Sequence, residues 1–387
     1  MVAAMATENR IRHSGILNLG NTGYIEVSLQ TLYHCTEFRE MILSLDLNGE
    51  PRDDPWIFQM VRELQGIYQQ WQKLENVLPP AEDPTGLVQH DVLRLVYAHI
   101  NPFIGPIGYV DPTKFVEAVQ KCITLRHPVD QPNDAQQFYC TFIRKLQLFF
   151  QMERTPNSAR ATFRRMFITP QSKSKRCCRC SEMLPGSNVL LKVGSLAYCF
   201  DCTVATIEPS GPEQHNNVTP LLAKALREGD VYAGVESENR CSCSPNQVVS
   251  ARITVQPVYT RLPDLLAVRF KRWPVSNRNA YFEFDEYIDL THLLDQGQQE
   301  YPLLYRLLSV VVHHGNTSGY GRYFSYIRCN GGDQWARFWN TDVIPVNWET
   351  IQRESFGGHH DGKPSSDITN VAYMLHYEKV RPRPATT

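Results

Sequence analysis

The stretch GILNLGNTGYIEVSLQ, residues 15–30, decides how the rest of the chain is interpreted. Its middle, residues 20–23, is rich in Gly and Asn, which favour tight turns because they tolerate unusual backbone angles. Beyond this turn, apolar side chains recur at the spacing of one helical face. These residues are Ile25, Leu29, Leu32 and Tyr33. The stretch therefore predicts a turn that leads directly into a helix.

Working outward, the first half of the chain is predicted to be mostly helical. Amphipathic patterns over residues 55–78 and 89–101 predict two helices, and the prolines between them keep these elements separate. The segment NDAQQFYCTFIRKLQLFF, residues 133–150, predicts another helix, with Asn133 or Asp134 as its N-cap. Its apolar face is formed by Phe138, Phe142, Leu146 and Phe149.

After about residue 160 the pattern changes to short alternating runs that are typical of strands. These runs cover residues 189–193, 248–255, 265–270, 305–313 and 323–327. Two segments, residues 208–218 and 355–367, are rich in turn-forming residues and are expected to be loops. The chain is therefore predicted to be an α+β protein with a helical first half, a cysteine-rich insertion and a β-rich second half.

Composition excludes several classes of function. Hydrophobic residues make up 42% of the 387, enough for a sizeable core, so the chain is not disordered throughout. Its 39 Lys and Arg against 40 Asp and Glu give a net charge of -1, which argues against nucleic acid as a partner. No apolar run reaches the ~20 residues that span a bilayer, so no membrane partner is expected. No secretory signal is visible at the start, and a reducing compartment, cytoplasmic or nuclear, is expected.

The eleven cysteines include clustered pairs that favour a metal site. Cys177-x-x-Cys180 places two thiolates on one turn, as in half of a tetrahedral zinc site. Two pairs are available to complete it: Cys241 with Cys243, and the alternative Cys199 with Cys202. The alternative without a metal is a set of free thiols that are packed in the interior or lie on the surface. We expect structural zinc, and the choice of the second pair stays open.

The opening stretch closely resembles the cysteine box of the ubiquitin-specific proteases, G-L-x-N-x-G-N-T-C-Y-x-N-x-x-L-Q. Other blocks follow in family order. Residues 133–138 (NDAQQF) resemble Q-Q-D-A-x-E-F, residues 262–273 resemble L-P-x-x-L-x-x-x-x-K-R-F, and residues 305–315 resemble the strand before the catalytic histidine. Residues 335–338 (WARF) and 372–377 (AYMLHY) match the last two blocks, so the resemblance covers nearly the whole chain.

This resemblance implies a papain-like fingers–palm–thumb fold, with zinc often held in the fingers. It places one domain over residues 14–380, with the thumb at about 14–160, the fingers at about 161–260 and the palm at about 261–380. Residues 1–13 are expected to be a disordered N-terminus and residues 381–387 a tail.

The same alignment shows that the family's catalytic residues are missing. The chemistry needs a thiolate, a histidine base and an orienting Asp or Asn. The nucleophile position is Gly23, which has no side chain, and the histidine position is Arg322, which stays protonated near pH 7. The third position, directly after Phe338, is Trp339, which cannot accept a hydrogen bond from an imidazole. Asn340 remains as a possible orienting amide, and no proteolysis by the usual mechanism is expected.

No other residue is expected to replace the nucleophile. Cys35 lies 12 residues along the predicted helix, about 18 Å away, and is interpreted as a packed thiol. Asn18 matches the family's oxyanion-stabilising position, although without a nucleophile a turn role is favoured. His313 is a potential base, but with no nucleophile it would have only water to activate.

The resemblance still implies positions that could bind ubiquitin. In the family, the position of Asp134 engages the basic C-terminal tail of ubiquitin, and a helix cap is its simpler role. Tyr323, Gly321 and His313 match positions that line the channel for this tail. Arg322 in the former site is expected to disfavour the arginine-rich tail.

Three hypotheses about function follow. The favoured one is an inactive ubiquitin-specific-protease homologue that binds ubiquitin or a ubiquitin-like modifier, or acts as a scaffold with other proteins. The second is an active cysteine deubiquitinase with an unusual site. The third is a zinc-stabilised interaction module that no longer binds ubiquitin.

Overall fold

The computed structural model of the chain describes most of the predicted elements. The described residues are 13–49, 54–76, 108–152, 155–168, 171–182, 189–191, 204–207, 216–228, 230–257, 262–272, 280–293, 302–317, 320–329, 332–357 and 369–381. The helix predicted at 89–101 and the pair Cys199 and Cys202 lie outside these residues.

The chain forms two compact units, each built from two separate segments. The first unit contains Met1–Arg160 and Leu308–Met374, and the second contains Ala161–Leu307 and Leu375–Thr387. The boundary falls inside one helix and two strands, α7 (Asn157–Phe167), β12 (Leu304–Thr317) and β16 (Asn370–Lys379). The division into thumb, fingers and palm within one domain stays a prediction.

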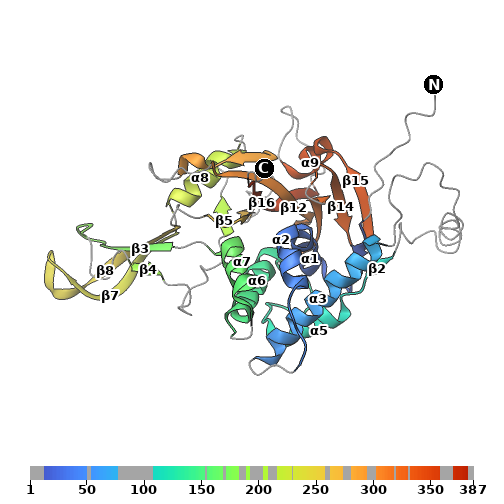
Figure 1. Ribbon diagram of the computed structural model, residues 1–387. Helices are drawn as coiled ribbons and strands as arrows, with labels where there is room; N and C mark the ends of the chain where they lie inside the picture. Colours follow the sequence, from blue (N-terminus) through green and yellow to red (C-terminus); the bar gives the residue numbers. More distant parts are fainter. Residues whose placement is uncertain are drawn as a thin grey trace, which may run out of the picture. The chain divides into compact units, whose positions relative to one another are not determined.

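Five helices of the first unit lie in the predicted helical half and are drawn in blue to green in Figure 1. They are α1 (Gly23–His34), α2 (Thr36–Leu43), α3 (Pro55–Asn76), α5 (Thr113–Cys122) and α6 (Ala135–Gln151). Helix α1 packs on α6 on one side and on strands β13 (Tyr320–Arg328) and β14 (Trp335–Trp339) on another. Every residue of α1 is consequently buried, including polar ones such as Glu26 and His34.

Helix α6 forms as its sequence predicts. Asp134 is the N-cap, and its Oδ1 accepts a hydrogen bond of 2.8 Å from the backbone N–H of Gln137. All four residues of the predicted apolar face are buried, and the rings of Phe138 and Phe142 stack at 5.6 Å. Local capping and a helical apolar stripe thus place Asp134 at the start of a rigid, well-packed helix.

The strands of the first unit form an antiparallel sheet in the order β15 (Asp342–Val346), β14, β13, β12. Helix α9 (Trp348–Ser355) follows β15, and the side chain of its N-cap Asn347 accepts a hydrogen bond from Thr350 N. Strand β1 (Gly15–Ile16) pairs in parallel with β2 (Tyr109–Val110). A Cβ on Gly15 would lie 2.4 Å from the backbone oxygen of Asn340, so only glycine allows this approach to the β14–β15 turn.

The second unit contains a four-stranded antiparallel sheet, labelled β3, β4, β7 and β8 in Figure 1. Its order is β4 (Val189–Leu191), β3 (Gln171–Cys177), β8 (Ser244–Pro257), β7 (Asp230–Cys241). In the same unit, β5 (Val204–Ile207) pairs in parallel with β9 (Leu265–Phe270), and β11 (Tyr287–Asp289) pairs antiparallel with β12. Strand β6 (Asn216–Asn217) pairs with β10 (Phe282–Glu283).

Two expectations about irregular segments were wrong. Residues 216–218 are not loop: they form β6 and the start of helix α8 (Val218–Glu228), where the side chain of Asn217 accepts a hydrogen bond from Thr219 N. Asparagine favours helix starts as well as loops, so composition alone misassigned it. Nor does disorder extend to residue 13, because His13 is buried and its Nδ1 lies 2.8 Å from Glu75 Oε1.

No helix within the described ranges is both long enough and apolar enough to cross a membrane.

Candidate functional site

The turn before α1 is held by a small network of side-chain hydrogen bonds. Thr22 Oγ1 accepts a hydrogen bond from Leu19 N at 2.9 Å and donates one to Glu26 Oε1 at 2.8 Å. Asn18 accepts from Gly20 N through Oδ1 and donates through Nδ2 to Asn340 Oδ1 at 3.0 Å. Asn18 therefore acts as a turn residue, and Asn340 uses its amide oxygen to hold it.

Gly23 is the first residue of α1 and faces the backbone of β13. A Cβ at this position would lie 3.1 Å from Tyr323 O and 3.9 Å from Asn18 Nδ2. A Cβ here would therefore require the β13 backbone to shift by a few tenths of an ångström.

Arg322 and Trp339 lie on neighbouring strands and have different surroundings. Arg322 is exposed on β13, directly across from His314 of β12. Trp339 on β14 stacks on Phe324 at 5.2 Å, and the His314 ring lies 5.3 Å away. The Trp339 indole is thus held by aromatic packing at the position where the family has a hydrogen-bond acceptor.

A cavity of about 290 Å³ lies at the start of α1. It is lined by Asn18, Gly20, Asn21, Gly23, Tyr24, Pro132, Asn133, Gly321, Arg322, Tyr323 and Asn340. Trp339 is not among these lining residues, whereas its neighbour Asn340 is. Among the described residues, the lining thus contains no thiol, no imidazole and no carboxylate, and it offers no nucleophile paired with a base.

The three residues assigned to the tail channel lie together at the edge of this cavity. His313 is buried, and a Cβ on Gly321 would lie 2.1 Å from its Nε2. The rings of His313 and Tyr323 meet edge to face at 5.2 Å. Gly321 is required here because the imidazole occupies the space that a side chain would need.

Asp134 follows Asn133, which lines the cavity, and its carboxylate has two hydrogen-bond partners. Its Oδ1 caps α6, and its Oδ2 accepts a hydrogen bond from the hydroxyl of Tyr373. The carboxylate is half-buried. The predicted cap is confirmed, and a role in binding remains to be tested.

Glu26 is a residue of this region that the motif comparison did not single out. It is 2% exposed, and burial raises the pKa of its carboxyl to about 7, although hydrogen bonds from Thr22 and Asn18 oppose the shift. The sequence could have drawn attention to Glu26, because the family motif has Asn at this position. A buried acid three residues from Gly23 is a further departure from the family's pattern.

Two other side chains of this region, Cys35 and His314, have defined surroundings. Cys35 is 4% exposed, as expected for a packed thiol, although α1 ends at His34 and Cys35 starts the next helix. His314 has an unforeseen partner, since its Nδ1 lies 2.7 Å from Asn370 Oδ1. This pair resembles a base with an orienting amide, but no described nucleophile accompanies it in the cavity lining.

Four cysteines of the second unit come together as a group. The Sγ atoms of Cys177 and Cys243 are 3.7 Å apart, and those of Cys180 and Cys241 are 3.3 Å apart. Four sulfurs at 2.3 Å from a tetrahedral zinc ion would be about 3.8 Å from one another, so the donor set fits the ion. Backbone N–H groups of Cys180 and Arg179 lower the pKa of Cys177 to about 7. These four cysteines can therefore hold a metal ion, and Cys199 and Cys202 lie outside the described residues.

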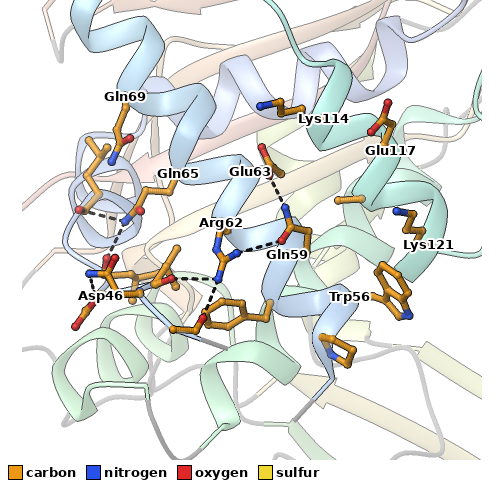
Figure 2. Close-up of a pocket in the computed structure, with 18 of the residues that line it drawn as sticks. Asp46, Trp56, Gln59, Arg62, Glu63, Gln65, Gln69, Lys114, Glu117 and Lys121 are labelled. Carbon is orange, nitrogen blue, oxygen red and sulfur yellow. Dashed lines mark hydrogen bonds between the residues drawn. The ribbon is translucent and has the colours of Figure 1, made fainter. Parts of the chain in front are cut away.

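A second, larger hollow of the first unit is lined by described residues that include none of the predicted site residues. It measures about 1550 Å³ and lies between α3, α5 and the loop after α2 (Figure 2). Its polar side chains bind one another or nearby backbone oxygens: Gln59 donates to Glu63, and Arg62 donates to the backbone oxygen of Gly49. Lys121 lies 4.8 Å from the ring of Trp56. Among its described lining residues, we find no nucleophile paired with a base.

Comparison with known proteins identifies the class. The family described as Ubiquitin carboxyl-terminal hydrolase matches residues 14–377. Relatives include Ubiquitin carboxyl-terminal hydrolase 44 of Danio rerio, 26% identical over 84% of this chain and 52% of its own length. The same-named protein of Ailuropoda melanoleuca is 25% identical over 84% of this chain and 53% of its own. Ubiquitin carboxyl-terminal hydrolase 4 of Arabidopsis thaliana is 22% identical over 96% of this chain and 94% of its own.

The chain belongs to the ubiquitin carboxyl-terminal hydrolase family, as the resemblance of its motifs indicated. It spans about half the length of the two hydrolase 44 relatives that it matches. Its α+β fold and its four grouped cysteines agree with this membership.

Proposed function

We propose that this protein is a catalytically inactive member of the family that acts by binding ubiquitin or a ubiquitin-like modifier. One observation carries the proposal. The cavity where the reaction would occur is lined by glycines, amides, a guanidinium and two tyrosines, with no thiol or imidazole among its described lining residues. Cysteine-protease chemistry needs both a thiolate and a base, and the loss of even one such group costs several orders of magnitude in rate.

Ubiquitin binding is supported by the elements that surround the former catalytic positions. Regular structure is present at the start of α1, along β13 and at the capped end of α6. Asp134, at that end of α6, has a half-buried carboxylate. A carboxylate that is already oriented by Tyr373 and by a helix cap loses little entropy when it engages a basic peptide.

We also propose that zinc occupies the four-cysteine group as a structural ion. The sulfur separations support this ion, and a closed four-thiolate site leaves no open position for substrate. The ion would hold together the ends of β3 and β7, because Cys177 and Cys241 are their last residues and Cys180 and Cys243 lie in the turns that follow them.

Catalysis is tested with a ubiquitin probe that carries an electrophile at its C-terminus. The wild-type chain should form no covalent adduct. A stable thioether adduct that disappears when one cysteine is replaced would establish the second hypothesis, an active enzyme with an unusual site, and overturn this proposal.

Binding is tested by titrating labelled ubiquitin against the wild type and two variants of Asp134. Asp134→Asn retains a good N-cap but removes the charge, whereas Asp134→Ala removes both. Loss of a charge-assisted hydrogen bond should weaken binding about tenfold in both variants, while only Ala destabilises α6. If the wild type does not bind ubiquitin at high micromolar concentration, the third hypothesis, an interaction module without ubiquitin, is favoured instead.

A further inference from the structure

Three potential metal ligands meet in the interior of the first unit, apart from both sites described above. They are His13, which precedes β1, His34, the last residue of α1, and Cys329, which follows β13. One ligand atom from each lies within 4.8 Å of the others. Their exposed fractions are 8%, 3% and 4%, so the group is enclosed by protein.

His13 is oriented in the way that metal-binding histidines usually are. Its Nδ1 lies 2.8 Å from Glu75 Oε1, and the other carboxylate oxygen accepts a 2.7 Å hydrogen bond from the hydroxyl of Tyr33. An imidazole that donates Nδ1–H to a carboxylate keeps the lone pair of Nε2 for a metal. Glu75 thus supplies the outer partner of a carboxylate–histidine–metal arrangement.

His34 provides an independent observation that points to a ligand at this group. Its Nδ1 is buried and has no hydrogen-bond partner among the described residues. A buried ring nitrogen without a partner is costly and needs an explanation, and coordination to an ion would provide one.

Cys329 completes the group as a buried thiol. Its Sγ lies 3.6 Å from the carbonyl oxygen of Ile327, a weak contact. The ring of Phe338 lies 5.0 Å from that of His34 and 6.2 Å from that of His13, which gives the group an apolar wall. Such a wall strengthens the attraction between a metal ion and its ligands.

We propose that His13, His34 and Cys329 form a second metal site, suited to a borderline transition-metal ion such as Zn²⁺. Two imidazoles and a thiolate match the ligand preference of this ion. Ligand atoms around zinc are about 3.3–3.8 Å apart, so the three need to close in by about 1 Å. As the sulfur–metal bond forms, the thiol proton leaves to solvent, and the thiolate with Glu75 balances the two positive charges.

The test is metal stoichiometry on the full chain, stripped of metal and then titrated with Zn²⁺ or Co²⁺. The wild type should bind two ions per chain, one in the four-cysteine group and one here. The double variant Cys241→Ser/Cys243→Ser should retain one ion. Its Co²⁺ form should show a thiolate-to-cobalt absorption band weaker than that of a four-thiolate site. His34→Gln and Cys329→Ser should each remove one ion from the wild-type count.

Cys122→Ser is the matched control, because Cys122 is also a buried thiol but contacts Met60 instead of this group. It should leave two ions bound. One ion in the wild type, lost with the Cys241/Cys243 change, would overturn the proposal. So would a second ion that survives both His34→Gln and Cys329→Ser. If Cys329→Ser does not fold, the count and spectrum of the double variant decide alone. Neither outcome depends on ubiquitin binding, so this site and the proposed function stand or fall separately.

Discussion

Replacing Glu26 by glutamine should stabilise the protein at neutral pH. The carboxyl is 2% exposed, and its burial raises its pKa from the ordinary 4.5 to about 7. Glutamine keeps the side-chain oxygen that accepts the hydrogen bond from Thr22 but never carries a charge. The substitution therefore removes the cost of burying a carboxylate and retains the contact at the start of α1.

The sign and size of the effect follow from the two pKa values. The folded state holds the proton up to about pH 7, whereas the unfolded chain releases it near 4.5, so folding takes up a proton between these values. Stability consequently falls as pH rises through this window. At about 1.4 kcal/mol per pH unit, the full cost above pH 7 is about 3 kcal/mol. Most of it, about 2 kcal/mol, should develop between about pH 5.5 and about pH 8.

Urea denaturation of wild type and Glu26→Gln at these two pH values measures the difference. The advantage of the variant should grow by about 2 kcal/mol from the lower pH to the higher. Glu40→Gln, which changes an exposed carboxyl on α2, is the control and should show a nearly constant difference. A Glu26→Gln advantage that does not change with pH would refute the reasoning, because it would mean that Glu26 titrates alike in both states.

Other substitutions test the packing around the site. Gly321→Ala should destabilise the folded protein by about 1–3 kcal/mol, because the new Cβ would lie 2.1 Å from His313 Nε2. Thermal denaturation measures this loss, and an unchanged stability would mean that the imidazole moves freely. Gly66→Ala in α3 is its counterpart and should stabilise by about 0.5–1 kcal/mol, since a Cβ there meets nothing within 4 Å. Asn347→Ala should cost about 1 kcal/mol in urea denaturation by removing the cap of α9, and Asn347→Asp should restore most of it.

Local features of the fold were predictable because their causes are local. The strand predicted at residues 265–270 has the same bounds as β9, since an apolar run bounded by polar residues needs no distant partner to be recognised. The cap and apolar face of α6 likewise depend on residues three and four apart. The residues at the family's catalytic positions could also be read from the sequence, because a motif read in order shows which residue occupies each position; that the site is inactive stays a prediction.

Contacts between distant segments were not predictable in this way. Nothing near Gly321 in the sequence shows that His313 fills the space over it, because the β12–β13 register brings the two together. The same holds for Trp339, whose ring packs on Phe324 and does not line the cavity, while Asn340 does. The pKa of Glu26 depends on how completely the neighbouring elements exclude water, which no local pattern reports.

By itself, the sequence determined the family, the α+β class and the absence of a nucleophile at Gly23, since these depend on residue identity and short-range spacing. Tertiary structure alone decided which cysteines meet: Cys177 and Cys180 lie with Cys241 and Cys243, about sixty residues on, because the pairing of β7, β8 and β3 brings these turns together. It also decided that His13, His34 and Cys329 share one interior site, which no spacing along the chain could indicate. Ligand groups form wherever the packed backbone brings side chains together, and that is a property of the whole fold.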